Sequence, residues 1–403
     1  MKILLVNKFL YAKGGSEAYV IRLGDYFISK GHEVQYFGME DKRNIIGNDW
    51  NLSVTNSDFH KKSLKTLLFP FKIIYSGEAR RKIKRIIKLF KPDVVHLNNI
   101  NFQLTPSIIY EIRKHNIPII FTAHDLQLIC PNHMLYQLKK GLICEECIES
   151  GFMRCVKNNC IHDSKLRSIL GFLESSLYHG LKTYSLIDKL ICPSEFMEKK
   201  LLCKPVFQGK TLMIHNPFQK AAKSEIVKKG NYVLYFGRFT KEKGIQTLIN
   251  VCRRLSEIQF VFAGEGPLEN EIRDIKNIKN TGFLKGNDLI KMISEACFTV
   301  YPSELYDNYP FSVIESITYG TPVIGADIGG IPEIIKHEYT GFLFQPGNGD
   351  ELTEKIRTLW EDRGLLDKLA MNCLKEEFET PDSHGQKLLD VYRQIIKDKE
   401  KIK

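Results

Sequence analysis

YPSELYDNYPFSVIE, residues 301 to 315, is the stretch that decides the fold class of this 403-residue chain. It begins as the polar end of a short apolar strand pattern, passes through a loop and enters a helical pattern at Phe311. A strand, a loop and a helix in this order are typical of an α/β domain, in which ligands bind beyond the carboxyl ends of the strands. Asp307 and Glu315 lie eight residues apart across the loop, and two carboxylates in these positions suit the hydroxyls of ribose and sugars. A helix cap and an exposed helical glutamate are the structural alternative.

The composition indicates a globular protein of two or three domains, because 403 residues exceed the ~100–200 residues of a typical domain. The opening MKILLVNKFLYAKGG becomes polar too soon for a signal peptide, and no stretch approaches the ~20 apolar residues of a transmembrane helix. We therefore expect a cytoplasmic chain, whose cysteines are thiols or metal ligands rather than disulfides. The net charge of +11 favours phosphorylated substrates, anionic lipids or nucleic acid as partners.

Strand patterns that alternate with helical patterns predict two doubly wound α/β halves. In the first half they cover residues 2–7, 33–37, 93–97, 117–124 and 190–193, and in the second half residues 232–236, 260–263, 298–301 and 322–325. Residues 205–230 are polar and basic and contain several helix breakers, which marks a domain boundary. We expect an N-terminal Rossmann-like domain at 1–205, a linker at 206–230 and a C-terminal Rossmann-like domain at 231–379, facing each other across a cleft.

Three loops near predicted strand ends carry groups suited to an anionic ligand. Gly14 and Gly15 precede a helical pattern, and a helix that begins at glycine offers unpaired N–H groups to a phosphate; a plain tight turn is the alternative. The loop GRFTKEKG supplies Arg238 for bidentate contact with phosphate and Lys243 as a point charge, unless it is only a basic surface turn. His124 ends a strand pattern at the same edge of the sheet as the glycine pair, although a lone histidine is more often structural.

A metal is indicated by the cysteines rather than by these loops. The chain has no Asp-x-Asp triplet and no Walker-type phosphate loop, so arginine, lysine and helix dipoles would carry the charge of a departing diphosphate. Four thiolates at the spacing C-x2-C-x7-C-x4-C could surround one structural zinc ion, and they come from Cys144, Cys147, Cys155 and Cys160. Free thiols or a regulatory disulfide are the alternatives, and ligands could also come from Cys130, His133 or His162. Such a closed site would stabilise a flap and take no part in catalysis.

Residues 60–91 are the most basic segment, with eleven lysines and arginines against one acid, Glu78, and with apolar residues interleaved. This basic amphipathic pattern is typical of a helix that lies on an anionic membrane surface. A charged helix face in solvent is the alternative. Nucleic acid is a poorer partner, because no recognised nucleic-acid-binding motif accompanies the charge.

Seven motifs occur in an order that resembles the retaining glycosyltransferases of family 4, which have the GT-B fold. The resemblance covers nearly the whole chain and rests on GGSE at 14–17, FTAHD at 121–125, GRFTKEKG at 237–244, FAGEGP at 262–267, TGFL at 281–284, the Asp307-x7-Glu315 unit and GTPVIGADIGGIPEII at 320–335. It implies transfer of a sugar from a nucleotide-sugar, a UDP-sugar before a GDP-sugar, without a catalytic metal. The acceptor, a glycan or a lipid-linked molecule in bacterial surface-polysaccharide synthesis, would bind mainly to the N-terminal domain.

The resemblance also implies roles for individual residues. Arg238 and Lys243 would bind the donor diphosphate and stabilise the leaving group, and His124 would line the reaction centre. Asp307 would contact the donor sugar, and Glu315 would hold the ribose hydroxyls. Further donor contacts, several of them through the backbone, would come from Gly14, Gly15, Thr281, Phe283, Asn308, Phe311, Ser312 and Val313. No dedicated catalytic base is then required, because the leaving phosphate can help to deprotonate the incoming hydroxyl.

Two features depart from the general family pattern. The family has Glu-x7-Glu where this chain has Asp307 at the first position, so Glu304 is an alternative contact for the donor sugar. The cysteine-rich insertion at 130–162 is expected only in a bacterial subgroup. The resemblance further implies that a helix at about 380–403 packs back on the N-terminal domain, and that the protein is peripheral at the inner face of the cell membrane. The alternative functions are a catalytically silent binding subunit, a nucleotide-sugar epimerase of the same fold and a zinc-dependent nucleic-acid binder.

Overall fold

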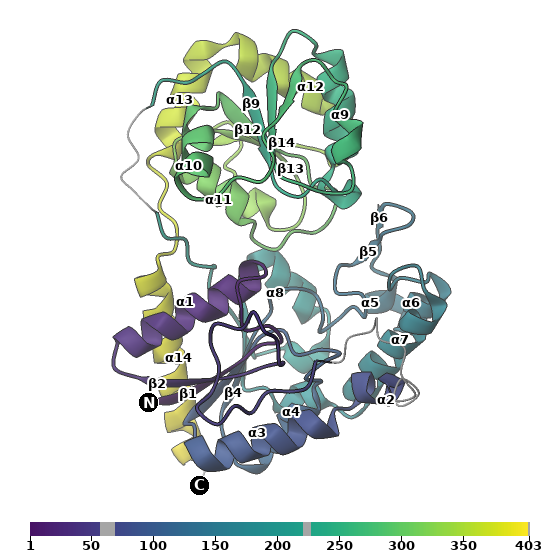
Figure 1. Ribbon diagram of the computed structural model, residues 1–403, viewed down its shortest axis with the longest axis vertical. Helices are drawn as coiled ribbons and strands as arrows, with labels where there is room; N and C mark the ends of the chain where they lie inside the picture. The colour runs from purple at the N-terminus through teal and green to yellow at the C-terminus, as the bar shows by residue number, and fades with distance from the viewer. Residues whose placement is uncertain (57–68, 221–226, 402–403) are drawn as a thin grey trace. The chain divides into compact units, whose positions relative to one another are not determined.

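The structure is a computed structural model that describes residues 1–56, 69–220 and 227–401. Contacts divide the chain into two compact units, and each unit surrounds its own parallel sheet (Figure 1). The first unit comprises Met1–Leu135, Cys144–Pro217 and Glu379–Lys403, and the second comprises Phe218–Phe378 with the short segment Tyr136–Ile143. The predicted α/β class with two doubly wound halves is confirmed.

Within its described residues, the first unit holds a six-stranded sheet in the order β2-β1-β3-β4-β7-β8, with neighbouring strands parallel. The strands are β1 (Lys2–Val6), β2 (Glu33–Phe37), β3 (Val94–Leu97), β4 (Ile119–Thr122), β7 (Lys189–Cys192) and β8 (Thr211–Met213). Central strands such as KILLV and IIFT are unbroken apolar runs, because helices cover both faces of a parallel sheet.

The last helix of the chain folds with the first unit. Helix α14 (Pro381–Lys401) lies beside α1 (Gly15–Ser29) (Figure 1), and its Leu388, Leu389 and Tyr392 join the apolar core of this unit. The other described helices of the unit are α2 (Phe69–Ile74), α3 (Gly77–Phe90), α4 (Ser107–Lys114), α5 (Glu146–Ser150), α6 (Met153–Lys157), α7 (Lys165–Gly180) and α8 (Glu195–Leu202), with 3₁₀ turns η2 (Thr183–Leu186) and η3 (Pro205–Phe207). The C-terminal segment is therefore part of the core that the N-terminal strands build.

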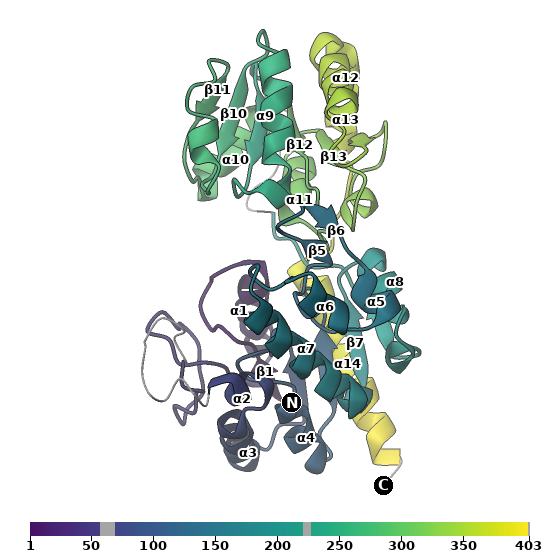
Figure 2. The same cartoon turned by 90° about the vertical axis from the view of Figure 1, so that its right-hand side faces the viewer.

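The described residues of the second unit also hold a six-stranded parallel sheet, in the order β11-β10-β9-β12-β13-β14 (Figure 2). Its strands are β9 (Val233–Phe236), β10 (Phe260–Ala263), β11 (Ile278–Asn280), β12 (Phe298–Tyr301), β13 (Val323–Ala326) and β14 (Gly341–Phe344). Its helices are α9 (Ile245–Arg254), α10 (Gly286–Glu295), α11 (Phe311–Thr318), α12 (Gly349–Glu361) and α13 (Arg363–Cys373), with 3₁₀ turns η4 (Lys241–Lys243), η5 (Glu269–Glu271) and η6 (Ile331–Glu333). Val233 and Tyr235 pack with α9 and α12, whereas Leu234 and Phe236 pack with α10, as the alternation along a strand requires.

Several short elements were absent from the sequence prediction. Strands β8, β11 and β14 each lie at an edge of their sheet, and β8 and β11 have three residues and partly exposed side chains, so they show no apolar run. Strand β8 lies inside the predicted linker, because the first unit continues to Pro217. The hairpin of β5 (Tyr136–Gln137) and β6 (Leu142–Ile143) groups with the second unit, whereas the insertion that contains it was assigned to the N-terminal domain.

Where it is described, the basic segment buries its apolar side chains. In α3, the buried residues include Ile83, Ile86 and Ile87, and the exposed residues include Arg81, Lys84, Arg85 and Lys88. The core therefore occupies most of the apolar face of α3, and the side open to a membrane is charged apart from Leu89, which is 47% exposed. Residues 60–68 of the predicted membrane segment lie outside the described residues. No described helix has the length and apolar character needed to span a bilayer.

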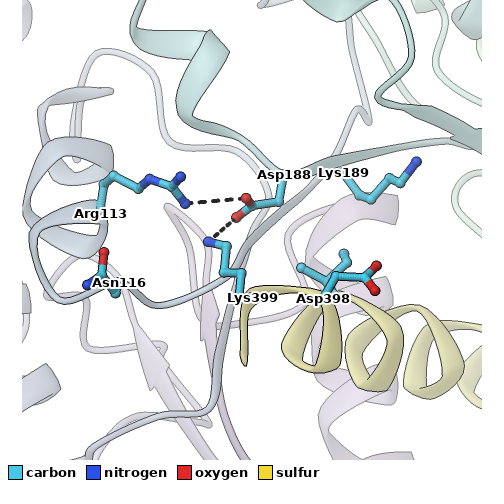
Figure 3. Close-up of a pocket in the computed structure, with 7 residues that line it drawn as sticks. Arg113, Asn116, Asp188, Lys189, Asp398 and Lys399 are labelled. Atoms are coloured by element: carbon cyan, nitrogen blue, oxygen red, sulfur yellow. Dashed lines mark hydrogen bonds and ion pairs between the residues drawn. The ribbon is translucent and has the colours of Figure 1, made fainter. Parts of the chain in front are cut away.

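A pocket of about 470 Å³ in the first unit lies at the amino ends of β4 and β7, opposite to the edge where ligand loops are expected (Figure 3). There Asp188 accepts hydrogen bonds from Arg113 at 3.3 Å and from Lys399 at 2.7 Å. The Ile119 N–H donates to the same carboxylate at 2.7 Å. These bonds tie the end of α14 to the sheet, so the charged groups of this pocket serve the fold. A pocket of about 620 Å³ lies at the amino edge of the second sheet, beside Asn231.

Candidate active site

Lys243 and Asp307 form an ion pair at the carboxyl edge of the second sheet. Lys243 ends the turn η4 after β9, and Asp307 lies in the loop between β12 and α11. The Nζ of Lys243 lies 2.6 Å and 2.8 Å from the two carboxylate oxygens of Asp307. Both side chains are only 16% exposed. Because β9 and β12 are neighbours in the sheet, the loops that follow them meet and bring together residues that are 64 positions apart.

Tyr301 and Ser303 complete the surroundings of Asp307. The hydroxyls of Tyr301 and Ser303 donate to Oδ2 of Asp307 at 2.9 Å and 2.7 Å. Burial raises the pKa of Asp307, but Lys243 and these hydrogen bonds outweigh burial and hold the pKa below its ordinary value. Asp307 is therefore a carboxylate that neutralises the Lys243 ammonium. An anionic ligand that approaches Lys243 competes with this carboxylate for the same cation.

Two glycines let the backbone close around the ion pair. Gly244 follows Lys243 with a φ of +69°, and a Cβ atom there would lie 1.7 Å from the carbonyl oxygen of Pro302. Gly329, after β13, has a φ of +63°, and a Cβ atom there would lie 2.4 Å from the carbonyl oxygen of Asp307. Only glycine suits both the conformation and the close approach. The glycines of GRFTKEKG and GADIGG thus fix the backbone on either side of the pair.

Arg238 lies in the loop directly after β9, and its side chain is exposed. The Tyr235 hydroxyl donates to the Arg238 carbonyl oxygen at 2.8 Å, which anchors this loop to the strand. Burial and Asp307 raise the pKa of Tyr301, and the nearby Arg238 guanidinium opposes this rise. Arg238 and Lys243 therefore place two cations at the same edge of the second sheet.

The remaining acidic candidates occupy different places in this unit. Glu304 accepts a hydrogen bond from Thr247 on α9, and its N–H donates to the Glu242 carbonyl oxygen at 3.0 Å. The carboxylate beside Lys243 is therefore that of Asp307, while Glu304 binds α9. Glu315 is half-buried in the second turn of α11.

The other predicted donor residues lie on α11 and in the loop after β11. Asn308 is half-buried before α11, which begins with Phe311, Ser312 and the buried Val313. The Thr281 N–H donates to the Phe262 carbonyl oxygen at 2.9 Å, so Thr281 continues the alignment of β11 with β10. Phe283 is 69% exposed. An aromatic ring so exposed is available to stack on a flat ligand.

In the first unit, α1 begins at Gly15 with Gly14 at its N-cap position, and both glycines are exposed. The backbone of Gly14 is extended, so the absence of a side chain leaves the helix start open rather than permitting an unusual conformation. Asn99, after β3, donates to the Ser16 hydroxyl at 3.0 Å, and Gln127 donates to Asn99 Oδ1 at 3.1 Å. The start of α1 is thus joined to the loops after β3 and β4 by neutral amides and a hydroxyl.

His124 lies just after β4 and has a defined tautomer. Asn98 donates through Nδ2 to the Val6 carbonyl oxygen at 3.3 Å, which turns its Oδ1 toward His124. His124 Nε2 lies 2.8 Å from this Oδ1, so Nε2 carries the proton and Nδ1 is the acceptor nitrogen. Burial lowers the pKa of His124 to about 4, and the imidazole is neutral at pH 7. A neutral acceptor of this kind suits a hydroxyl group.

The structure thus gathers the predicted residues into two groups. Arg238, Lys243 and Asp307 lie in the second unit, and Gly14, Gly15 and His124 lie in the first. Tyr301 and Ser303 had no predicted role, although both lie in the segment 301–315 that contains Asp307. Asn98 was also overlooked, because it is separated from His124 by 26 residues and no pattern links them.

The four predicted zinc ligands form no metal site. Among the described residues, no group of three or more His, Cys, Asp or Glu side chains could hold an ion. The ten cysteines, including Cys144, are free thiols. Burial raises the pKa of Cys147 to about 12, and the pKa of Cys155 is raised mainly by a hydrogen bond with Cys160. Neighbouring thiols contribute to both shifts, so the cysteines of the insertion lie near one another as free thiols.

Comparisons with known proteins agree with the motifs along the chain. Residues 13–219 match the family described as Glycosyltransferase Family 4, and residues 218–376 match the family described as Glycosyl transferases group 1. The sulfoquinovosyl transferase SQD2 of Arabidopsis thaliana is 34% identical over 156 residues, which are 37% of this chain and 30% of that protein. A protein of 42.6 kDa in the cps region of Klebsiella pneumoniae is 24% identical over 359 residues, 83% of this chain and 87% of that protein.

The lengths that align differ between these relatives. The chain spans less than half the length of the first curated relatives that it matches. By contrast, the crystal structure of Anabaena HepE in complex with UDP superimposes with a TM-score of 0.68 and 16% identity, over 98% of this chain and 100% of that one. The fold is therefore GT-B. The family 4 match alone covers more than half of the residues, so the chain belongs to glycosyltransferase family 4.

Proposed function

We propose that this protein is a retaining, metal-independent glycosyltransferase that moves a sugar from a nucleotide-sugar, with UDP-sugars favoured over GDP-sugars. The observation that carries this proposal is the Lys243–Asp307 pair, with Arg238 at the same edge of the second sheet. A diphosphate needs cations that are already in place where its charge develops. HepE, which has the same fold, was crystallised with UDP and with UDP-glucose, and this supports a uridine nucleotide.

The cations Arg238 and Lys243 support a reaction in which the diphosphate leaves without a metal ion. The bond between the anomeric carbon and the diphosphate oxygen breaks, and the electron pair departs with the diphosphate. Lys243 and Arg238 would stabilise that charge as it develops, which is where enzymes gain most. The acceptor oxygen bonds to the anomeric carbon on the face from which the diphosphate leaves, and its proton passes to the leaving diphosphate, so the anomeric configuration is retained. Asp307 would meanwhile accept hydrogen bonds from the donor sugar.

The acceptor is proposed to be a glycan or a lipid-linked molecule of bacterial surface-polysaccharide synthesis. The relative encoded in the cps region of Klebsiella pneumoniae, which aligns with 83% of this chain, supports this class. Contact with the inner face of the membrane would be electrostatic, because α3 exposes cations while its apolar side is buried. We expect Arg81, Lys84, Arg85 and Lys88, all changed to Gln, to weaken co-sedimentation with phosphatidylglycerol vesicles at low salt. Equal binding by this variant, or equal binding to phosphatidylcholine vesicles, would contradict the membrane contact.

A thermal-shift screen against UDP, GDP, ADP and their sugar conjugates tests the donor class, because a ligand that binds only the native state raises the Tm. We expect UDP and one UDP-sugar to raise the Tm of the wild type and to leave the Tm of Arg238→Ala unchanged. The donor that binds is then incubated with lipid-linked and oligosaccharide acceptors, and the product is analysed by NMR for an unchanged anomeric configuration. Binding without turnover would favour a silent binding subunit. An isomerised nucleotide-sugar in the absence of acceptor would favour an epimerase.

A further inference from the structure

A continuous set of contacts inside the first unit links His215, His384, Tyr19 and His124. His384 Nδ1 lies 2.9 Å from the carbonyl oxygen of His215. His384 Nε2 lies 2.9 Å from the hydroxyl of Tyr19. The ring of Tyr19 then meets the ring of His124 edge to face, with 4.8 Å between centroids and 71° between planes. Tyr19 and His384 are 5% and 1% exposed, so solvent does not compete for these contacts.

The direction of each hydrogen bond follows from the chemistry of the partners. A carbonyl oxygen only accepts, so Nδ1 of His384 carries the proton. Burial lowers the pKa of His384 to about 4, and the neutral ring has its lone pair on Nε2. The Tyr19 hydroxyl is therefore the donor to Nε2. The Tyr19 hydroxyl also hydrogen-bonds Thr122, the residue that binds His96, so two polar contacts fix the orientation of the Tyr19 ring.

The four residues come from segments that matter for the proposed reaction. Tyr19 belongs to α1, the helix that begins at Gly15. His215 lies two residues before the first unit ends at Pro217, and His384 lies five residues after the unit resumes at Glu379. The contacts thus reach from both segments where the chain passes between its units to the imidazole at the end of β4.

We propose that Tyr19 and His384 are positioning residues of the glycosyl transfer: they hold the His124 imidazole in one orientation and link it to the segments that join the two units. Asn98 holds the ring through Nε2, and Tyr19 supports it by the edge-to-face contact. This inference rests on the proposed function, because that function places His124 at the reaction centre. Tyr19 and His384 themselves act through His124.

A second buried pair on α14 provides a matched control. Tyr392 hydrogen-bonds through its hydroxyl to His96 Nδ1, at 2.5 Å, and both residues are fully buried. This pair joins α14 to the first sheet, whereas the Tyr19–His384 pair joins α14 to α1, and each pair consists of one tyrosine and one histidine. His96 lies within β3 and binds Thr122 through its other nitrogen, at 2.7 Å. Because Thr122 also hydrogen-bonds Tyr19, this pair is joined to the set through Thr122, and loss of the Tyr392 hydroxyl should disturb His124 much less than loss of the Tyr19 hydroxyl.

Four variants separate positioning from stability. Tyr19→Phe keeps the ring but loses the donor. His384→Asn can still donate to the His215 carbonyl, whereas its short side chain does not reach Tyr19. His384→Gln places an amide group near the position of Nε2 and should restore part of the function. Tyr392→Phe removes an equally buried hydroxyl elsewhere.

We expect Tyr19→Phe and His384→Asn to lower kcat roughly tenfold with donor KM changed less than about twofold, since misplacing a reacting group chiefly affects turnover. Tyr392→Phe should lower the Tm as much as Tyr19→Phe does while kcat stays within about twofold of the wild type. Partial recovery of kcat is expected in His384→Gln. Loss of kcat in Tyr392→Phe equal to that in Tyr19→Phe would overturn the proposal, because the effect would then follow stability alone.

A measurement without turnover keeps this inference separate from the proposed function. Imidazole ¹⁵N NMR of the full chain should show His124 protonated at Nε2 and His384 at Nδ1, with assignments from His124→Asn and His384→Asn. In Tyr19→Phe the His124 signals should shift more than those of His96, which is linked to Tyr19 through Thr122. Unchanged His124 signals would overturn the positioning role. A wild type that neither binds nor uses any nucleotide-sugar would instead refute the proposed function, whatever the NMR result.

Discussion

At the carboxyl edge of the second sheet a lysine is held in a buried ion pair, whereas at the same edge of the first sheet His124 is neutral beside the ionised Asp125. Lys243 is held by Asp307, with Arg238 nearby, in the second unit. In the first unit, His124 is an uncharged imidazole that donates to Asn98. In both sheets the first strand of the unit, β1 or β9, lies inside the sheet between two parallel neighbours. The difference thus lies in the loops, which suit one edge to a diphosphate and the other to a hydroxyl.

The largest effect is expected when the cation of the second unit is removed. Lys243→Ala should lower turnover by ~10²–10³, since a preorganised group at the developing charge is lost. The Tm should also fall, because Asp307 is left 16% exposed without its partner. Steady-state kinetics and thermal unfolding measure the two effects. Lys241→Ala is the matched control, because Lys241 is an exposed lysine of the same turn and should retain activity. Near-normal turnover in Lys243→Ala would remove the basis of the proposed function.

Removing the anion tests the other half of the pair. Asp307→Asn keeps the shape but no longer neutralises Lys243, so the affinity for UDP should stay the same or rise. Turnover should nevertheless fall roughly ten- to a hundredfold if Asp307 contacts the donor sugar, because positioning of that sugar is lost. Calorimetric titration with UDP and kinetics with the UDP-sugar separate the two effects. A loss of UDP affinity as large as in Lys243→Ala would show that Asp307 orients the lysine rather than competing with the ligand.

Sequence alone predicted the parts of the fold in which the residue types indicate burial or a loop. The apolar runs of the central strands and the glycines of the ligand loops identified two doubly wound halves and the residues around Lys243. Strands β8 and β11 were missed because these edge strands have partly exposed side chains and no apolar run. Strand β14, by contrast, is a largely buried apolar run of four residues, GFLF, that was overlooked. Asp307 was identified by its spacing from Glu315, whereas its partners Tyr301 and Ser303 look like ordinary ends of a strand.

Local sequence patterns did not predict the arrangement of the cysteines or the long-range contacts of the first unit. The fold does bring these thiols near one another, but no described group of them could hold a metal ion, and spacing alone does not contain that geometry. The contact of His384 with Tyr19 joins residues 365 positions apart, so no window of the sequence reveals it. Such contacts between neutral side chains depend on tertiary packing, whereas a cationic loop can be recognised from the lysines and arginines in its local sequence.

Acid should sharpen the contrast, because burial holds the pKa of His96 at about 3 and those of His124 and His384 at about 4, all in the first unit. These histidines take up protons near pH 6.5 only in the unfolded chain, so they destabilise the fold as the pH falls from 6.5 toward 4. Glu174 acts in the opposite direction, since burial raises its pKa to about 8 and the folded state holds its proton first. The net difference of about two protons corresponds to roughly 3 kcal/mol per pH unit.

The two tryptophans allow this to be measured in each unit. Trp50 lies in the first unit and Trp360 in the second, so Trp360→Phe and Trp50→Phe each leave one fluorescent reporter. Guanidinium titrations at pH 7.5, 6 and 5 should show the midpoint reported by Trp50 falling more steeply than that reported by Trp360. The second unit contains a single histidine, His337, whose side chain is 45% exposed. Equal falls of the two midpoints would contradict the assignment of acid sensitivity to the buried histidines.

The smallest effect is expected at Phe283, an apolar residue in the loop after β11 of the second unit. Its ring is 69% exposed, so Phe283→Ala should leave the Tm unchanged. If the ring stacks on the nucleobase, the Kd for UDP should rise about three- to tenfold, within the range of aromatic contacts, while kcat at saturating donor stays the same. Phe283→Tyr should bind UDP normally, because stacking needs only the aromatic face. A Phe283→Ala variant with unchanged UDP affinity would mean that the diphosphate and ribose contacts supply the binding, and that the charged edge alone selects the donor.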